Sequence, residues 1–251
     1  MSDVLITGGS DGIGLAAAKL LAASGSTRVT LVARSEANLR EAIATLPGGG
    51  HEFVVADLSQ PDGVARVAAC LGARHYDVLI NNAGAGLYGR FAELPLEGQL
   101  RMMRLNMDSV IVLSHAYLRQ AQPGDALVNT ASFLAYAPLP GAAAYSATKA
   151  FVAALSETLW WEYRKSGVYV LGFSPGVVAT RFHGTAGKSV AAFPRIPVQS
   201  PEGAAGELVA ALRRRRAPRV ITGFATRLMI LLQRLVSRKA AINMMGTSSA
   251  K

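Results

Sequence analysis

The sequence predicts an α/β protein built on a doubly wound parallel sheet, in a single domain with a C-terminal amphipathic helical extension. Strand-like and helix-like segments alternate along the chain, the strand-like segments are apolar throughout, and a glycine-rich turn follows the first of them. The length of 251 residues suits one large domain. With 51% hydrophobic and 17% charged residues, the composition excludes a disordered chain.

The strand-like segments are short runs rich in β-branched residues. Continuous apolar strands of this kind belong to a parallel sheet that helices cover on both faces. Six are expected, at Val4–Thr7, Val29–Ala33, Phe53–Ala56, Val78–Asn81, Ala126–Thr130 and Val168–Phe173. Helices are expected between them, at residues 13–24, 36–46, 61–71, 97–121 and 144–166. Such repeated units take right-handed crossovers, which gives a Rossmann-like sheet.

The first strand runs directly into the segment TGGSDGIG at residues 7–14. Glycines let the backbone turn sharply and approach a pyrophosphate, and the next helix directs its N-terminal N–H groups at the anion. A glycine-rich turn can also be merely structural, so its place between the first strand and the first helix is what favours dinucleotide binding. The residues expected to line the cofactor here are Gly8, Ser10, Asp11, Gly12, Ile13 and Gly14.

The end of the second strand should meet the adenosine ribose. An acidic side chain there would accept a hydrogen bond from a free 2′-hydroxyl, but the sequence has Ala33, Arg34 and Ser35. A guanidinium can pair with a 2′-phosphate through two parallel hydrogen bonds. Arg34 and Ser35 therefore favour NADP(H), while a solvated arginine at a helix start remains the alternative.

Tyr145 and Lys149 are four residues apart in an expected helix, so the phenol and the ammonium share one face. A neighbouring cation favours phenolate, which we expect to bring the tyrosine pKa closer to the range of a general acid–base. Ser132 follows the fifth strand and can donate to a developing alkoxide. Alone, a Tyr–Lys pair of this spacing is more often an exposed helix pair.

Taken together and in order, these motifs resemble those of the short-chain dehydrogenase/reductase family. The resemblance covers roughly residues 3–215 and rests on six ordered pieces. They are TGGSDGIG at 7–14, Asp57-Leu58, Asn81-Asn82-Ala83-Gly84, Asn106, the Ser132–Tyr145–Lys149 set, and Pro175-Gly-Val-Val-Ala-Thr180.

The resemblance implies a role for each piece. Tyr145 would exchange the proton, Lys149 would lower its pKa and hold the nicotinamide ribose, and Ser132 would orient the substrate oxygen. Asn106 would hold a water in a proton relay behind Lys149. Further cofactor contacts are implied at Asp57 and Leu58 (adenine), Asn82, Ala83 and Gly84 (ribose), and Pro175, Gly176, Val178 and Thr180 (nicotinamide carboxamide).

Three other motifs imitate different enzymes. Ser10 sits in a G-x-S-x-G turn, but no earlier strand supplies the oxyanion loop of a hydrolase. Ser146 and Lys149 match S-x-x-K without its companion motifs, and residues 184–189 imitate a phosphate-binding loop that lacks its first glycine. The four histidines show no metal-ligand spacing, so no metal site is expected.

The net charge of +10 lies entirely in the C-terminal part of the chain. Residues 1–212 hold 16 basic and 16 acidic side chains, whereas residues 213–251 hold ten Lys or Arg and no Asp or Glu. A helix at Pro201–Arg216, a strand at Arg219–Thr222 and an amphipathic helix at 224–239 are expected there. We therefore divide the chain into residues 1–223, the dinucleotide-binding and catalytic part, and 224–251, a basic extension.

Residues 213–239 could contact an anionic membrane surface or an acidic carrier, or could simply pack over the cleft or a second subunit. The arginine-rich tail lacks a basic–aromatic groove, so no nucleic acid is expected. The single cysteine fits a reducing cytoplasm, and no N-terminal signal is apparent. The expected location is cytoplasmic, with membrane contact left open.

The substrate is expected to be an apolar carbonyl compound or alcohol, with an acyl chain or several rings. This expectation rests on Leu87, Tyr88 and a lid expected at residues 181–200. The alternatives are an NAD-dependent alcohol dehydrogenase of the same fold and a noncatalytic dinucleotide-binding sensor or scaffold. The resemblance further implies a homodimer or homotetramer that pairs through residues 97–121 and 144–166.

Overall fold

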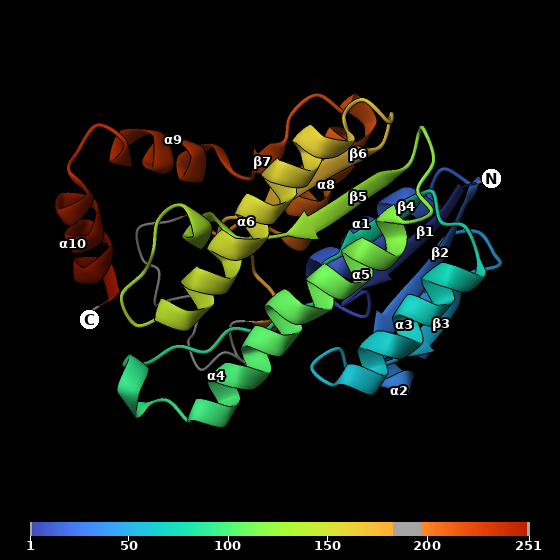
Figure 1. The fold of residues 1–251 in the computed structure, drawn as a ribbon, viewed down its shortest axis with the longest axis horizontal. Coiled ribbons are helices and arrows are strands. Elements are labelled where there is room, and N and C mark those ends of the chain that lie inside the picture. Colours follow the sequence, from blue (N-terminus) through green and yellow to red (C-terminus); the bar gives the residue numbers. More distant parts are fainter. Residues whose placement is uncertain (1, 183–196, 250–251) are drawn as a thin grey trace.

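The computed structural model of the protein describes residues 2–182 and 197–249. It confirms the Rossmann-like fold: seven parallel strands form one sheet in the order β3-β2-β1-β4-β5-β6-β7, flanked by helices (Figure 1). The strands are β1 (Ser2–Thr7), β2 (Thr27–Ala33), β3 (Glu52–Val55), β4 (Val78–Asn81), β5 (Ala126–Thr130), β6 (Tyr169–Ser174) and β7 (Arg219–Ile221).

Helices cover both faces of the sheet because strand side chains alternate between two apolar layers. On β1, Val4 and Ile6 pack into the layer beneath α1, α2 and α8, while Leu5 packs into the layer beneath α3, α5 and α6. The bounds of these helices are α1 (Gly12–Ala22), α2 (Glu36–Ala44), α3 (Pro61–Ala73), α5 (Ser109–Leu118), α6 (Ala143–Tyr163) and α8 (Pro201–Arg214).

The predicted helix at 97–121 is not uniform. It consists of α4 (Leu96–Met103), a π-helical turn η2 (Arg104–Asp108) and α5. A π turn carries one extra residue, and such turns are frequent at functional sites. The extra residue here lies beside Asn106, which is fully buried. There are also two short 3-10 turns, η1 (Phe91–Glu93) before α4 and η3 (Phe133–Ala135) after β5.

The prediction of one helix over 224–239 is wrong. Helix α9 (Phe224–Gln233) ends earlier, and a second helix, α10 (Arg238–Ser249), follows. Figure 1 shows both set apart from the layers around the sheet, on the side where β7 ends. Within the described residues, no helix combines the length and apolar character that crossing a bilayer needs.

The sheet reverses its winding between β1 and β4, which are hydrogen-bonded neighbours. In such folds ligands bind at this switch point, beyond the carboxyl ends of the strands. Gly8 after β1 and Ala83 after β4 touch there: a Cβ on Gly8 would lie 2.9 Å from the Ala83 Cα.

Candidate active site

A cavity of about 800 Å³ lies beyond the carboxyl ends of the strands. It brings together all but two of the site residues predicted from the sequence. Those that line it are Gly8, Ser10, Asp11, Gly12, Ile13, Arg34, Ser35, Asp57, Leu58, Asn82, Ala83, Gly84, Ser132, Tyr145, Lys149, Pro175, Gly176, Val178 and Thr180.

Gly14 and Asn106 do not line the cavity; they support its wall. A Cβ on Gly14 would lie 2.3 Å from the Gly8 carbonyl oxygen, so only glycine lets helix α1 pack on the turn. The Asn82 amide donates to the carbonyls of Thr7 and Gly8, each at 3.2 Å. The glycine-rich turn is therefore held in two ways: α1 packs on it closely at Gly14, and Asn82, which follows β4, donates hydrogen bonds to it.

Asn106 fastens the segment after β4 to helix α6. Its Oδ1 accepts from Ala85 N at 3.0 Å, and its Nδ2 donates to Ala85 O at 2.9 Å and to Thr148 Oγ1 at 3.1 Å. Because both amide hydrogens have protein partners, the side chain could offer a relay water only the second lone pair of Oδ1. Its clearest contribution in this structure is to position the wall behind Lys149.

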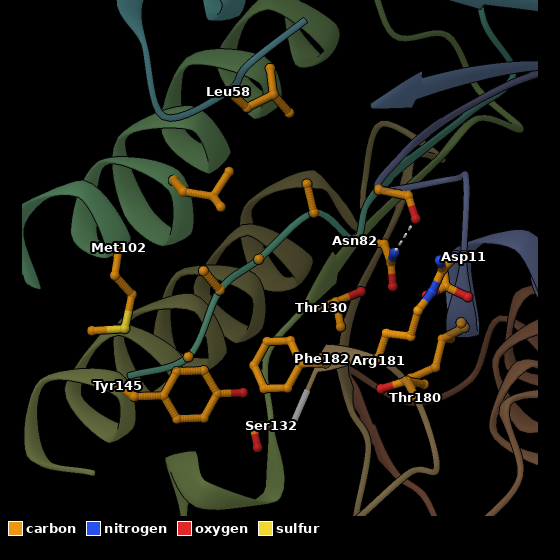
Figure 2. Close-up of a pocket in the computed structure, with 18 of the residues that line it drawn as sticks. Asp11, Leu58, Asn82, Met102, Thr130, Ser132, Tyr145, Thr180, Arg181 and Phe182 are labelled. Atoms are coloured by element: carbon orange, nitrogen blue, oxygen red, sulfur yellow. Dashed lines mark hydrogen bonds and ion pairs between the residues drawn. The ribbon is translucent and has the colours of Figure 1, made fainter. Parts of the chain in front are cut away.

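Tyr145 and Ser132 lie near one another in the cavity (Figure 2). Helix α6 carries Tyr145 on a buried face, and Ser132 caps η3 after β5, accepting from Leu134 N at 3.2 Å. Burial raises the pKa of Tyr145 to about 12, although a hydrogen bond with Ser132 acts in the opposite direction. The phenol is therefore protonated at neutral pH.

Lys149 is buried one helical turn after Tyr145 and donates to the Thr130 carbonyl at 2.8 Å. Burial lowers its pKa to about 8. We expected the ammonium to bring the Tyr145 pKa closer to neutrality, and this structure differs: Nζ lies 5.9 Å from the centroid of the phenol ring. The desolvation of the phenol outweighs the ammonium at that separation.

The cavity end beyond β2 and β3 is polar. Burial opposes ionisation of Asp57, but hydrogen bonds from Ser59 and Arg101 hold its pKa below the ordinary value. Arg101 of α4 reaches Asp57 Oδ2 at 2.8 Å and Ser59 Oγ at 3.0 Å. Sequence reasoning missed Arg101 and Ser59, because the pairing of α4 with the loop after β3 is visible only in three dimensions.

The opposite end is apolar and surrounds Tyr145. The rings of Tyr88 and Phe182 each lie 5.8 Å from the Tyr145 ring, centroid to centroid. Met102 and Leu134 complete this wall. Tyr88 was singled out from the sequence, whereas Phe182 and Met102 were not. Residues 183–196, which hold most of the predicted lid, the phosphate-loop imitation and His183, lie outside the described residues.

A cluster at the other end of the sheet holds one histidine and two carboxylates. Ligand atoms of His75, Asp77 and Asp125 lie within 4.8 Å of one another, a grouping that histidine spacing could not predict. Both carboxylates already accept backbone N–H groups: Asp77 from Asp3 at 2.6 Å and Asp125 from Gln122 at 2.7 Å. The bond from Asp3 joins the start of β1 to the residue before β4, and the bond from Gln122 closes the turn before β5.

The chain was compared with known proteins. The family model described as short chain dehydrogenase matches residues 2–190. The chain is 32% identical over 191 residues to a probable oxidoreductase EphD of Mycobacterium tuberculosis, a match that covers 73% of this chain and 32% of that protein. It is 33% identical over 184 residues to a putative ketoacyl reductase of granaticin polyketide synthase from Streptomyces violaceoruber, covering 70% of this chain and 67% of that protein.

Two solved structures share most of the fold. A short-chain dehydrogenase from Sphingobium yanoikuyae in complex with NADPH superposes with a TM-score of 0.83 at 32% identity, covering 94% of this chain and 93% of that one. A bulky-bulky ketone specific alcohol dehydrogenase from Comamonas testosteroni superposes with a TM-score of 0.77 at 27% identity, covering 94% and 92%.

Proposed function

Because this chain belongs to the short-chain dehydrogenase/reductase family, we propose that it is an NADP(H)-dependent oxidoreductase acting on an apolar ketone or secondary alcohol. One observation carries the proposal: Ser132, Tyr145 and Lys149 meet in a cavity that also contains the glycine-rich turn. The NADPH complex of a 32% identical relative and the ketoacyl reductase relative support the cofactor and the carbonyl substrate.

The residues present fit a dinucleotide. The glycine-rich turn leaves no room for larger side chains at its glycines. For example, a Cβ on Gly12 would lie 2.9 Å from Thr180 Cγ2. Thr130 offers a buried hydroxyl on the cavity wall that has no hydrogen-bond partner among the described residues. The glycine-rich turn and α1 would hold the pyrophosphate, Asp57 and Leu58 the adenine, and Lys149, Pro175, Gly176, Val178 and Thr180 the nicotinamide end.

Arg34 supports the phosphorylated cofactor. Its side chain is exposed on the cavity wall and, within the described residues, forms no ion pair with an acid. Ser35 beside it caps α2 by accepting from Asn38 N at 3.3 Å. A guanidinium free of a carboxylate partner is available to a 2′-phosphate.

The chain's own residues supply the proton and the orientation. When bound, the nicotinamide supplies or accepts the hydride. Tyr145, held neutral by burial, would donate its proton to the oxygen of a reduced carbonyl. Ser132 would donate a hydrogen bond to the same oxygen. The aromatic and aliphatic wall of Tyr88, Phe182 and Met102 favours an apolar substituent on the substrate.

The test is NADPH oxidation by the full chain against ketones graded in size and chain length, with Tyr145→Phe as the matched variant. We expect turnover to rise with apolar bulk, and Tyr145→Phe to lose about a thousandfold in kcat while still binding NADPH. Near-normal turnover by the variant would exclude the mechanism. NADPH binding without turnover of any ketone would instead support the noncatalytic sensor.

We further propose that two or four copies assemble through α5 and α6. Ile111 and Val112 on α5 and Trp161 on α6 are large apolar side chains that remain exposed in the single chain. Sedimentation of the chain and of a Val112→Glu variant checks this: the variant should shift the assembly toward monomer.

A further inference from the structure

Helix α9 turns its apolar side away from the protein. Phe224, Leu228 and Leu231 are spaced four and three residues apart on α9, so they form one stripe, and Leu235 follows in the turn just after the helix. Phe224 is 73% exposed and Leu235 78% exposed. We call this stripe, together with the exposed residues Leu232 and Leu235, the α9 ridge.

The side of α9 that faces the protein is fixed in place. Thr226 and Ile230 are buried, and Ile230 joins the apolar cluster that contains Tyr145 and Tyr88. On α10, Ala241 and Met245 are buried as well, and Met245 joins the same cluster. The ridge therefore stands on a helix anchored beside the active-site wall. A frayed helix end would lack these buried contacts.

The groups around the ridge are cationic. Arg234, Arg238 and Lys239 are exposed, and no carboxylate of the described residues forms a salt bridge with any of them. Arg227 pairs with Glu207 at 2.9 Å, and Glu207 is the last acidic residue in the sequence. An exposed apolar stripe with several positively charged side chains beside it is the pattern of a helix that lies in an anionic lipid interface.

We propose that the α9 ridge docks the protein on an anionic membrane surface. The large apolar side chains would enter the boundary between headgroups and acyl chains, while the flanking cations would meet lipid phosphates. A second copy of this chain fits less well, because a two-fold contact of the ridge would bring like charges together. The docking is independent of the proposed reaction, and its test does not depend on turnover.

The first measurement is flotation of the full chain with vesicles of phosphatidylcholine alone and of phosphatidylcholine with about one-third phosphatidylglycerol. We expect binding to the anionic vesicles only, and binding that weakens as salt is raised from about 0.05 to 0.5 M. Equal binding to both kinds of vesicle, or no binding to either, would overturn the proposal.

Variants separate the apolar and cationic contributions. Leu231→Glu with Leu235→Glu should lower vesicle partitioning at least about tenfold, since both remove inserted apolar area and add repelled charge. Arg234→Gln with Lys239→Gln should lower it about fivefold per charge. The matched controls are Phe91→Glu, an equally exposed aromatic on η1, and Arg119→Gln, an exposed cation at the end of α5; both should bind as the parent chain does.

Circular dichroism and NADPH binding check that each variant is folded. If the parent chain does not bind vesicles and the ridge variants change its sedimentation coefficient, the ridge is a subunit interface and the proposal fails. Saturable binding of an acidic carrier protein without vesicle binding would also overturn it.

Discussion

Arg181 and Asp11 form an ion pair across the cofactor end of the cavity, with Arg181 Nε 2.6 Å from Asp11 Oδ2 (Figure 2). The pair links the glycine-rich turn after β1 to the segment after Thr180, 170 residues later in the chain. The bond to Asp11 raises the pKa of Arg181. Because Asp11 precedes the helix end that would hold a pyrophosphate, its negative charge would oppose the cofactor if Arg181 did not offset it.

We predict that substituting Asp11 and substituting Arg181 have opposite effects on NADPH binding. Asp11→Asn removes the opposing charge, so the Kd should fall about two- to fivefold, whereas Arg181→Ala should raise it by a similar factor. The effects are modest because both side chains are well exposed to solvent. NADPH fluorescence titration measures them, and shifts of the same sign in both variants would contradict this account.

Cofactor preference should depend on Arg34. Arg34→Glu places a carboxylate where a 2′-phosphate would bind, so KM for NADPH should rise at least about thirtyfold while KM for NADH changes little. Arg40→Glu on α2, a cation already paired with Glu36, is the matched control. Initial rates with each cofactor give the answer; equal effects on both would favour an NAD-dependent enzyme.

The buried Lys149 should make stability depend on pH. Its pKa is about 8 in the folded chain and 10.5 ordinarily, so between these values the unfolded chain keeps a proton that the folded chain has lost. The free energy of unfolding should therefore rise with pH through this window, by up to about 3 kcal/mol. Below pH 8 the charged ammonium destabilises the fold by that amount.

Lys149→Met removes this contribution. The variant should be more stable than the parent chain at pH 7, and the difference should shrink as the pH approaches about 10.5. The contribution of Tyr145 to the pH dependence has the opposite sign, because its raised pKa makes the free energy of unfolding fall above pH 10. Both chains contain Tyr145, so this contribution cancels in the difference between them. Urea unfolding at several pH values measures the difference, and a constant difference would refute the assignment.

Two glycines of α3 should respond in opposite ways to alanine. A Cβ on Gly63 would lie 2.2 Å from the Asp57 carbonyl oxygen, whereas nothing lies within 4 Å of a Cβ on Gly72. Gly63→Ala should cost about 2–4 kcal/mol and weaken NADPH binding, because it displaces the loop that carries Asp57. Gly72→Ala should stabilise the helix by about 0.5–1 kcal/mol. Thermal unfolding distinguishes them, and equal Tm shifts would exclude the packing explanation.

Much of the fold was readable from local patterns. The neighbouring strands β4 and β5 have the predicted bounds, because an apolar run that Asn follows or that Pro–Gly precedes is distinctive. The end of α9 was missed, since the apolar spacing of Leu231, Leu232, Leu235 and Val236 continues past Gln233. Periodicity reports which side chains could share a face and does not report whether a helix continues.

The site was predictable where short motifs carry the chemistry. Ser132, Tyr145 and Lys149 were named in sequence order and lie together in the cavity. Arg101, Met102, Phe182 and Arg181 were not singled out, because each enters the cavity through the packing of a distant helix or segment. The pKa of Tyr145 could not be anticipated either, since it depends on how deeply the phenol is buried.

The π turn Arg104–Asp108 has a consequence for how this helix can vary. One extra residue shifts the helical phase by about 100°, so the faces of α4 and α5 are rotated relative to one another. Met102 of α4 lines the cavity, whereas Ile111 and Val112 of α5 are exposed. A substitution at Met102 would therefore change the cavity wall, whereas a substitution at Ile111 or Val112 would change the exposed surface.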